Sequence, residues 1–171
     1  MRSALAASIL AELNRRGETL ASAESLTGGM IGALLTDIPG ASESYLGGVI
    51  SYATRLKGTL AGVDRGTLAE LGPVSGRTAA EMARGVAELC TADWGLATTG
   101  VAGPDDQHGH PVGQVFVAVS HDAAALLRVE ELSLDGDRAA IRRQAASAAL
   151  GLLADVLGLN SVALAEDDAS A

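Results

Sequence analysis

Cysteines, aromatic residues and lysines are scarce in this chain of 171 residues, and each scarcity excludes a class of structure or chemistry. The single cysteine, Cys90, rules out an internal disulfide and a cysteine-based metal site. It falls on the apolar face of a predicted helix, where we expect a small core residue rather than a nucleophile. With one Trp, one Phe and two Tyr, the core must be built from Ala, Leu, Val and Ile.

Basic residues are also in the minority, because 12 Lys and Arg stand against 21 Asp and Glu for a net charge of −9. Three of the acidic residues lie in segment 160–171, which we expect to be an acidic, disordered tail. The acidic body argues against a nucleic-acid partner but allows a small phosphorylated ligand. No apolar run could span a bilayer and no signal-peptide pattern is present, so we expect a cytoplasmic protein that binds no membrane.

Apolar periodicity and turn residues predict a single α/β domain over residues 1–159. Helices are expected at 3–16, from a Thr27 cap to Pro39, as two short turns within 54–72, from a Ser75 cap to about 89, and from an Asp137 cap to 157. Strands are expected at 19–23, 45–52, 93–98, 114–120 and 124–134. Helical crossovers join the early strands and short turns join the late ones. The predicted fold is a three-layer α/β/α sandwich with a mixed, mostly parallel sheet of about five strands.

Three unusual loops follow predicted strands, at 22–29 (Ser-Ala-Glu-Ser-Leu-Thr-Gly-Gly), 52–57 (Tyr-Ala-Thr-Arg-Leu-Lys) and 98–105 (Thr-Thr-Gly-Val-Ala-Gly-Pro-Asp). The first places Ser25 before a helix, where free N–H groups favour negative charge. The third leaves a strand without bulky side chains, so its N–H groups would be accessible to a ligand. Because α/β sheets bind ligands beyond their strand ends, these loops predict one site.

A serine nucleophile needs a base, and the histidines His108, His110 and His121 have no obvious carboxylate partner. Lys57 is the only lysine among eleven arginines, and burial can lower the pKa of a lysine until it serves as a base. Tyr52, five residues earlier, could relay a proton. Taken singly, each residue has a simpler interpretation: Ser25 as a helix cap, Lys57 as a solvated cation and Tyr52 as a rim residue.

Arg138, Arg142 and Arg143 occupy the first turns of the last predicted helix, where the helix dipole disfavours cations. Such cations need a partner, either Asp135 or Asp137 or a substrate phosphate. The loop-bound histidines at 108 and 110 are too sparse to predict a metal site.

Several ordered motifs resemble the CinA carboxy-terminal domain family, also known as nicotinamide-nucleotide amidohydrolases. They are Ala-Glu-Ser-Leu-Thr-Gly-Gly at 23–29, Gly-Val-Ile-Ser-Tyr-Ala-Thr-Arg-Leu-Lys at 48–57, Gly-Pro-Val-Ser at 72–75, Thr-Gly-Val-Ala-Gly-Pro at 99–104, Pro-Val-Gly at 111–113 and Gly-Asp-Arg-Ala-Ala-Ile-Arg-Arg-Gln at 136–144. The resemblance runs from about residue 4 to 157 and implies a standalone domain. The chain departs from the usual pattern at Leu26, where many members have Cys, and at Thr54-Arg55, where many have Asn-Glu.

This resemblance implies hydrolysis of the nicotinamide mononucleotide carboxamide to nicotinate mononucleotide and ammonia, by a homo-oligomer that needs no metal or other cofactor. Carried over by motif, Ser25 is the nucleophile, Lys57 the general base and Tyr52 an aid to proton transfer. Substrate contacts are expected from Glu24, Thr27, Gly28, Gly29, Thr99, Gly100 and Arg142. Oxyanion donors are expected among the N–H groups of 27–29 or near Gly100.

Two other functions fit the same residues. A non-catalytic module that binds a nucleotide or phosphate would use the anion-friendly loops without chemistry. A serine–lysine amidase could act on a different amide. The separation between the Ser25 hydroxyl and the Lys57 amine discriminates between the binding module and an enzyme.

Overall fold

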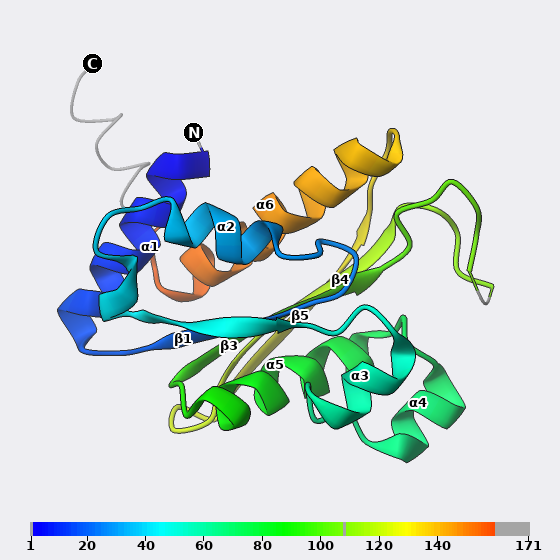
Figure 1. Ribbon diagram of the computed structural model, residues 1–171, viewed down its shortest axis with the longest axis horizontal. Coiled ribbons are helices and arrows are strands. Elements are labelled where there is room, and N and C mark those ends of the chain that lie inside the picture. Colours follow the sequence, from blue (N-terminus) through cyan, green and yellow to red (C-terminus); the bar gives the residue numbers. More distant parts are fainter. Residues whose placement is uncertain (1, 108, 160–171) are drawn as a thin grey trace.

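Five strands form one sheet in the computed structural model, which describes residues 2–107 and 109–159 (Figure 1). The strand order is β2-β1-β3-β4-β5, with β1 at Leu20–Glu24, β2 at Tyr45–Ile50, β3 at Trp94–Gly100, β4 at Gln114–His121 and β5 at Leu126–Ser133. β1 pairs in parallel with β2 and β3, whereas β4 is antiparallel to both β3 and β5. Only β4 therefore runs against the other strands, and the predicted mixed sheet is confirmed. The acidic segment 160–171 lies outside the described residues.

Helices cover both faces of the sheet, as the predicted three-layer sandwich requires (Figure 1). One face carries α1 (Arg2–Arg16), α2 (Met30–Thr36) and α6 (Arg138–Val156). The other carries α3 (Thr54–Thr59), α4 (Arg65–Leu71) and α5 (Gly76–Cys90), and a short 3₁₀ turn, Ala41–Glu43, precedes β2. The two short helices expected within 54–72 are therefore α3 and α4.

The core divides into two aliphatic layers, one on each face of the sheet. Leu, Ile and Ala from α1, α2 and α6 and Val from β4 fill the first layer, which also contains Trp94. Small side chains from α5, β1 and β3 fill the second layer, which also contains the buried aromatic ring of Phe116. Cys90 is half-buried at the edge of this second layer, and burial raises the pKa of its thiol. It is a packing residue, as its position in the sequence indicates.

Two of the three predicted helix caps are confirmed. The Ser75 hydroxyl accepts a hydrogen bond from the N–H of Thr78, and the Asp137 carboxylate accepts one from the N–H of Ala140. The expected Thr27 cap is wrong, because α2 begins only at Met30 and its first turn follows Gly29 in a left-handed conformation. Thr27 is instead buried, and its hydroxyl hydrogen-bonds the Thr98 hydroxyl at 2.8 Å.

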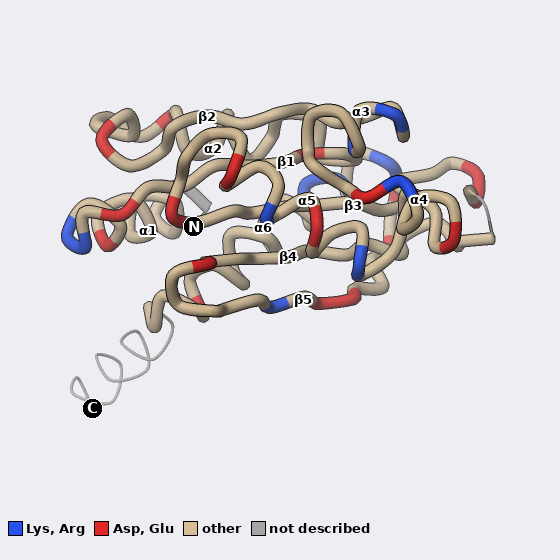
Figure 2. The backbone as a smooth tube through the Cα atoms, turned by 90° about the horizontal axis from the view of Figure 1, so that it is seen from below, with Lys and Arg blue, Asp and Glu red and all other residues tan. Residues whose placement is uncertain are grey.

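The carboxyl ends of β1, β2 and β3 meet at one edge of the sheet, because these three neighbours are parallel. The segments that follow them bring the three loops singled out in the sequence together there. Figure 2 shows acidic and basic positions intermixed around the molecule. Among the described helices, none combines the length and the apolar character that crossing a membrane requires.

Candidate active site

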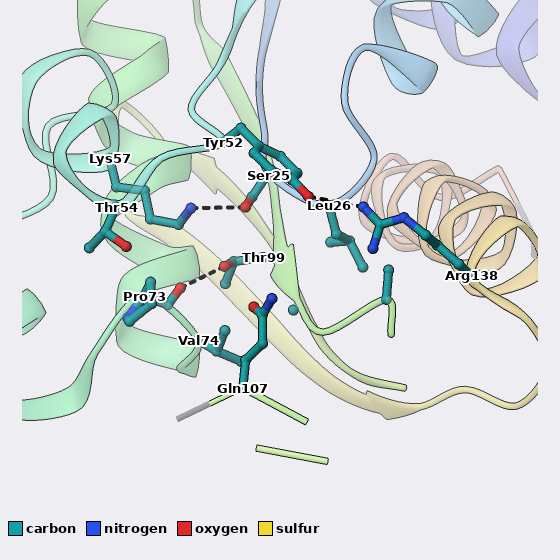
Figure 3. Close-up of a pocket in the computed structure, with 12 residues that line it drawn as sticks. Ser25, Leu26, Tyr52, Thr54, Lys57, Pro73, Val74, Thr99, Gln107 and Arg138 are labelled. Carbon is teal, nitrogen blue, oxygen red and sulfur yellow. Dashed lines mark hydrogen bonds between the residues drawn. The ribbon is translucent and has the colours of Figure 1, made fainter. Parts of the chain in front are cut away.

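A pocket opens at this edge of the sheet, and residues from several segments that are far apart in the sequence form its wall (Figure 3). Ser25 and Leu26 come from the turn after β1, and Tyr52, Thr54 and Lys57 from the segment after β2. Thr99, Gly100 and Ala102 come from the end of β3. Pro73 and Val74 precede α5, Gln107 belongs to the loop between β3 and β4, and Arg138 begins α6.

Ser25 and Lys57 meet at the floor of this pocket. The Lys57 Nζ lies 2.8 Å from the Ser25 Oγ, and the same amine donates to the Ser51 carbonyl at 2.8 Å. The Ser25 N–H donates to the Thr98 carbonyl at 3.0 Å, which fixes the backbone of the serine to β3. Both side chains are buried, although Ser25 still lines the pocket.

Burial gives Lys57 an unusual charge state. The residue is 2% exposed, and desolvation lowers the pKa of its amine to about 8. The burial of Lys57 follows from the path of the chain. α3 begins four residues after β2 ends, so Lys57, the third-to-last residue of this short helix, lies close to the edge of the sheet. The neutral amine can accept the Ser25 hydroxyl proton while an N–H still donates to the Ser51 carbonyl. A serine and a partly deprotonated lysine in contact are the components of a nucleophile–base pair.

Glu24, expected to contact substrate, has a structural position. Its carboxylate is 2% exposed and accepts hydrogen bonds from the N–H groups of Gly29, Ile31 and Gly32 at 2.9–3.1 Å. These groups are the unsatisfied donors at the start of α2, so Glu24 caps this helix from the preceding strand. The side chain faces the helix and does not line the pocket.

The turn at 27–29 is held by internal hydrogen bonds that occupy most of the expected oxyanion donors. The Gly28 N–H donates to the Ser25 carbonyl at 3.1 Å, and the Gly29 N–H donates to Glu24. The Leu26 N–H, by contrast, makes no hydrogen bond within the described part of the chain. It belongs to the residue directly after Ser25, and Leu26 lines the pocket.

Arg142 braces this turn from behind. Its guanidinium donates to the carbonyls of Leu26 and Thr27 at 2.8 and 3.0 Å. Gly28 leaves room for this contact, because a Cβ there would lie 3.1 Å from the Arg142 Nη2. Arg142 thus contacts the back of the turn and not the pocket. The arginine that lines the pocket is Arg138, one helical turn earlier.

Tyr52 and Arg138 join across the mouth of the pocket. Arg138 donates to the Tyr52 hydroxyl at 2.9 Å and to the Gly103 carbonyl at 2.5 Å. Tyr52 is 59% exposed, and Figure 3 shows its hydroxyl directed toward Arg138 while Lys57 reaches Ser25 from the other side. The expected proton-transfer aid therefore lies at the site but points away from the amine.

Thr99 and Gly100 shape the wall formed by β3. The Thr99 hydroxyl donates to the Pro73 carbonyl at 2.6 Å and ties β3 to the start of α5. A Cβ on Gly100 would lie 2.6 Å from the Gln114 carbonyl, so only glycine fits against β4 here. Both residues line the pocket, and their contact with substrate stays a prediction.

Sequence reasoning missed several residues of the pocket wall, above all Gln107. Nothing in the motif pattern points to it, since it lies in a loop with no periodicity. Arg138 could be noticed in the sequence as a cation at the start of a helix, but Arg142 and Arg143 share this feature, so the sequence does not show which of the three lines the pocket. The histidines lie away from the pocket wall or outside the described residues. His121 packs edge-on against Trp94, His110 hydrogen-bonds Gln114, and residue 108 is not described. In residues 2–107 and 109–159, no three His, Cys, Asp or Glu side chains cluster to hold a metal ion.

Comparison with known proteins places this α/β domain with its buried serine–lysine pair in a family. A sequence model of the CinA C-terminal domain matches residues 2–157. The chain is 47% identical over 149 residues to a CinA-like protein of Frankia casuarinae, covering 87% of the chain and 34% of that protein. A CinA-like protein of Myxococcus xanthus is 43% identical over 151 residues, 88% of the chain and 36% of that protein. The chain belongs to the CinA C-terminal domain family and spans about a third of the length of these relatives.

Solved structures agree with this assignment. The crystal structure of the competence/damage inducible protein CihA from Agrobacterium tumefaciens has a TM-score of 0.86 at 33% identity, covering 92% of this chain and 95% of that chain. The structure of a CinA superfamily protein from Klebsiella pneumoniae has a TM-score of 0.87 at 30% identity, covering 92% and 98%. The two departures from the family pattern have different surroundings. Leu26 is buried and lies both in the core and in the pocket wall, whereas Thr54 is exposed and lines the pocket and Arg55 is exposed away from it.

Proposed function

We propose that this chain is an amidohydrolase that hydrolyses the carboxamide of nicotinamide mononucleotide through Ser25 and Lys57. The single observation that carries the proposal is the 2.8 Å contact between the Lys57 Nζ and the Ser25 Oγ in a buried position. A module that only binds a ligand has no need for a desolvated lysine beside a serine hydroxyl. The geometry therefore favours an enzyme over the binding-module alternative.

The reaction begins with the neutral form of Lys57, which with a pKa of about 8 makes up about a tenth of the amine at pH 7. The amine takes the Ser25 proton as the oxygen attacks the carboxamide carbon, and a tetrahedral intermediate forms. The ammonium then returns that proton to the departing nitrogen, so ammonia leaves and the acyl group stays on Ser25. Water, activated by the same amine, releases the carboxylate and restores the serine.

The charge that develops on the carbonyl oxygen needs a donor close to Ser25. The Leu26 N–H is suited to this role because it is unpaired within the described residues, follows the nucleophile directly and belongs to the pocket wall. The hydrogen bonds from Arg142 to the carbonyls of Leu26 and Thr27 hold this part of the backbone in place. Arg142 acts here as a positioning residue.

Arg138 supplies the cation that a nucleotide phosphate requires. It lines the same pocket as Ser25, is exposed, and uses only part of its guanidinium on Tyr52 and Gly103. A planar guanidinium can bind a phosphate with two parallel hydrogen bonds. Tyr52, bonded to Arg138, would orient this cation in addition to closing the side of the pocket.

Ammonia release from nicotinamide mononucleotide by the purified protein tests this proposal. Turnover is expected in the wild type and not in Ser25→Ala. A panel of other amides separates the proposed substrate from a serine–lysine amidase of different specificity. Tight binding of the nucleotide without ammonia release would favour the non-catalytic module.

A further inference from the structure

Gln107 enters the pocket from a long loop that connects β3 to β4 (Figures 1 and 3). Figure 3 shows its side-chain amide directed into the pocket toward Thr99, with no hydrogen bond to the other residues drawn. The sequence predicts no role for it and no motif includes it. Within the part of the chain that the structure describes, the donor and acceptor groups of this exposed amide make no hydrogen bond. In the wall of a pocket that contains a nucleophile, such an amide is positioned to contact a ligand.

The backbone of Gln107 is held more firmly than its place in a loop suggests. Its N–H donates to the His110 carbonyl at 3.0 Å, and its carbonyl accepts from the His110 N–H at 2.8 Å. These two bonds close a tight turn. The loop is also held at its base. The Val101 N–H donates to the Gln114 carbonyl at 2.9 Å, the Gly113 N–H donates to the Val101 carbonyl at 2.8 Å, and the Val112 N–H donates to the Asp106 carboxylate at 2.8 Å.

A chain of side-chain contacts connects this turn to the sheet. The His110 ring hydrogen-bonds the Gln114 amide at 2.8 Å, and Gln114 donates in turn to the Glu131 carboxylate of β5 at 2.6 Å. The turn that carries Gln107 is thus braced against β4 and β5. A braced residue contacts a ligand at a lower entropy cost than one on an unsupported loop, so it can contribute to specificity.

The chemistry of the amide indicates which part of a nucleotide it reads. A neutral amide cannot neutralise a phosphate, and Arg138 already supplies a cation to the same pocket. The scissile carboxamide must lie at Ser25 for attack. A sugar hydroxyl, which both donates and accepts, matches the NH₂ donor group and the carbonyl acceptor that the Gln107 amide offers. The sugar is also the part of the substrate that lies between the scissile group and the phosphate.

Resting on the proposed function, we infer that Gln107 is a specificity-determining residue that hydrogen-bonds the ribose hydroxyls of the substrate. It selects ribonucleotide amides over amides that lack these hydroxyls. It takes no part in the chemical step and so acts on KM rather than on kcat.

The test compares nicotinamide mononucleotide with its 2′,3′-dideoxy analogue in the wild type and in Gln107→Ala. In the wild type, loss of the hydroxyls should raise KM about tenfold, the effect of one or two hydrogen bonds. In Gln107→Ala the KM for the mononucleotide should rise by a similar factor, while the KM for the analogue and both kcat values stay unchanged. Asp105→Asn, in the same loop and exposed, is the matched control and should keep the full discrimination.

An equal change in KM for both substrates, or no change for either, would overturn the role of Gln107 and leave the amidohydrolase intact. Calorimetry on Ser25→Ala, which cannot turn over, supplies a second readout. If the wild type releases no ammonia but Ser25→Ala still binds the ribonucleotide more tightly than the analogue in a Gln107-dependent way, the amidase fails and the Gln107 contact stands. Equal binding of both ligands, or of neither, overturns the contact.

Discussion

Ser25 and Ser75 both precede a helix, but their hydroxyls contact different kinds of group. Ser75 accepts from the N–H of Thr78 at 3.1 Å and caps α5. Ser25 precedes α2, but its hydroxyl contacts the buried amine of Lys57. The N–H groups at the start of α2 bond to the Glu24 carboxylate instead.

The difference shows how a serine becomes available for chemistry beside a helix. A free helix start draws a nearby hydroxyl into capping, which would hold the serine oxygen as an acceptor of backbone N–H groups. At the start of α2, Glu24 caps the helix in place of Ser25, because its longer side chain extends past the turn and accepts hydrogen bonds from three N–H groups. The serine oxygen can then face the pocket.

The largest expected effect is on kcat, which should depend on Ser25 and not on Ser75. Ser25→Ala and Lys57→Met should each lower kcat for ammonia release by about 10³-fold or more, because each removes half of the nucleophile–base pair. Ser75→Ala should leave kcat unchanged. Steady-state kinetics on the three variants provides the measurement, and wild-type turnover in Lys57→Met would exclude the amine as the base.

The next effect concerns the substitute cap. Glu24→Ala removes a buried acceptor of three N–H groups and should lower the free energy of unfolding by about 3 kcal/mol. Glu24→Gln keeps one acceptor oxygen and should lose about half as much. Urea unfolding measures both. A loss no larger than that of an exposed residue would contradict the capping role of Glu24.

Burial of the Lys57 amine predicts a pH-dependent cost in stability. Its pKa of about 8 in the folded chain is below the ordinary 10.5, so below pH 8 both states are protonated and the folded state bears the full penalty. Between pH 8 and 10.5 the unfolded chain binds more protons, so wild-type stability rises with pH. The stability of Lys57→Met relative to wild type should therefore fall by about 2 kcal/mol between pH 7 and pH 10.

Comparing the two proteins at each pH by urea unfolding cancels the contributions of other titrating groups. A relative stability that stays constant across this range would mean that the amine keeps the same pKa in both states.

The smallest effect is expected at the ordinary cap. Ser75→Ala should cost about 1 kcal/mol of unfolding free energy, the usual value for a lost N-cap. Ser75→Asp, which retains an acceptor, should recover most of it. Thermal unfolding of the pair would reveal an additional role for Ser75 if the Asp variant failed to recover stability.

Much of the fold could be predicted from the sequence, because residues that are close together in the chain determine many of its helices, strands and caps. The Ser75 and Asp137 caps and the two short helices within 54–72 depend on residues that are neighbours in the chain. The Thr27 cap failed because a buried partner 71 residues away, Thr98, competes for its hydroxyl. Such a competitor leaves no trace in the local pattern.

The candidate site divides in the same way. Ser25 and Lys57 could be singled out by residue type and by motif, and the structure brings them into contact. Which of the clustered arginines faces the pocket depends on the rotation of α6 against the sheet, and that rotation is set by packing. The position of Gln107 in the pocket wall depends on a turn that is closed by backbone hydrogen bonds, and the pattern of side chains in the sequence does not predict such a turn.

The proposed mechanism depends on the charge state of one amine, and the sequence offers a direct way to measure it. Lys57 is the only lysine of the chain, so labelling lysine with ¹³C and ¹⁵N gives a single side-chain signal in an NMR titration. We expect a midpoint near pH 8, because burial lowers the pKa of this amine. A midpoint at the ordinary value of about 10.5 would contradict it, because Lys57 would then remain charged and could not accept the Ser25 proton.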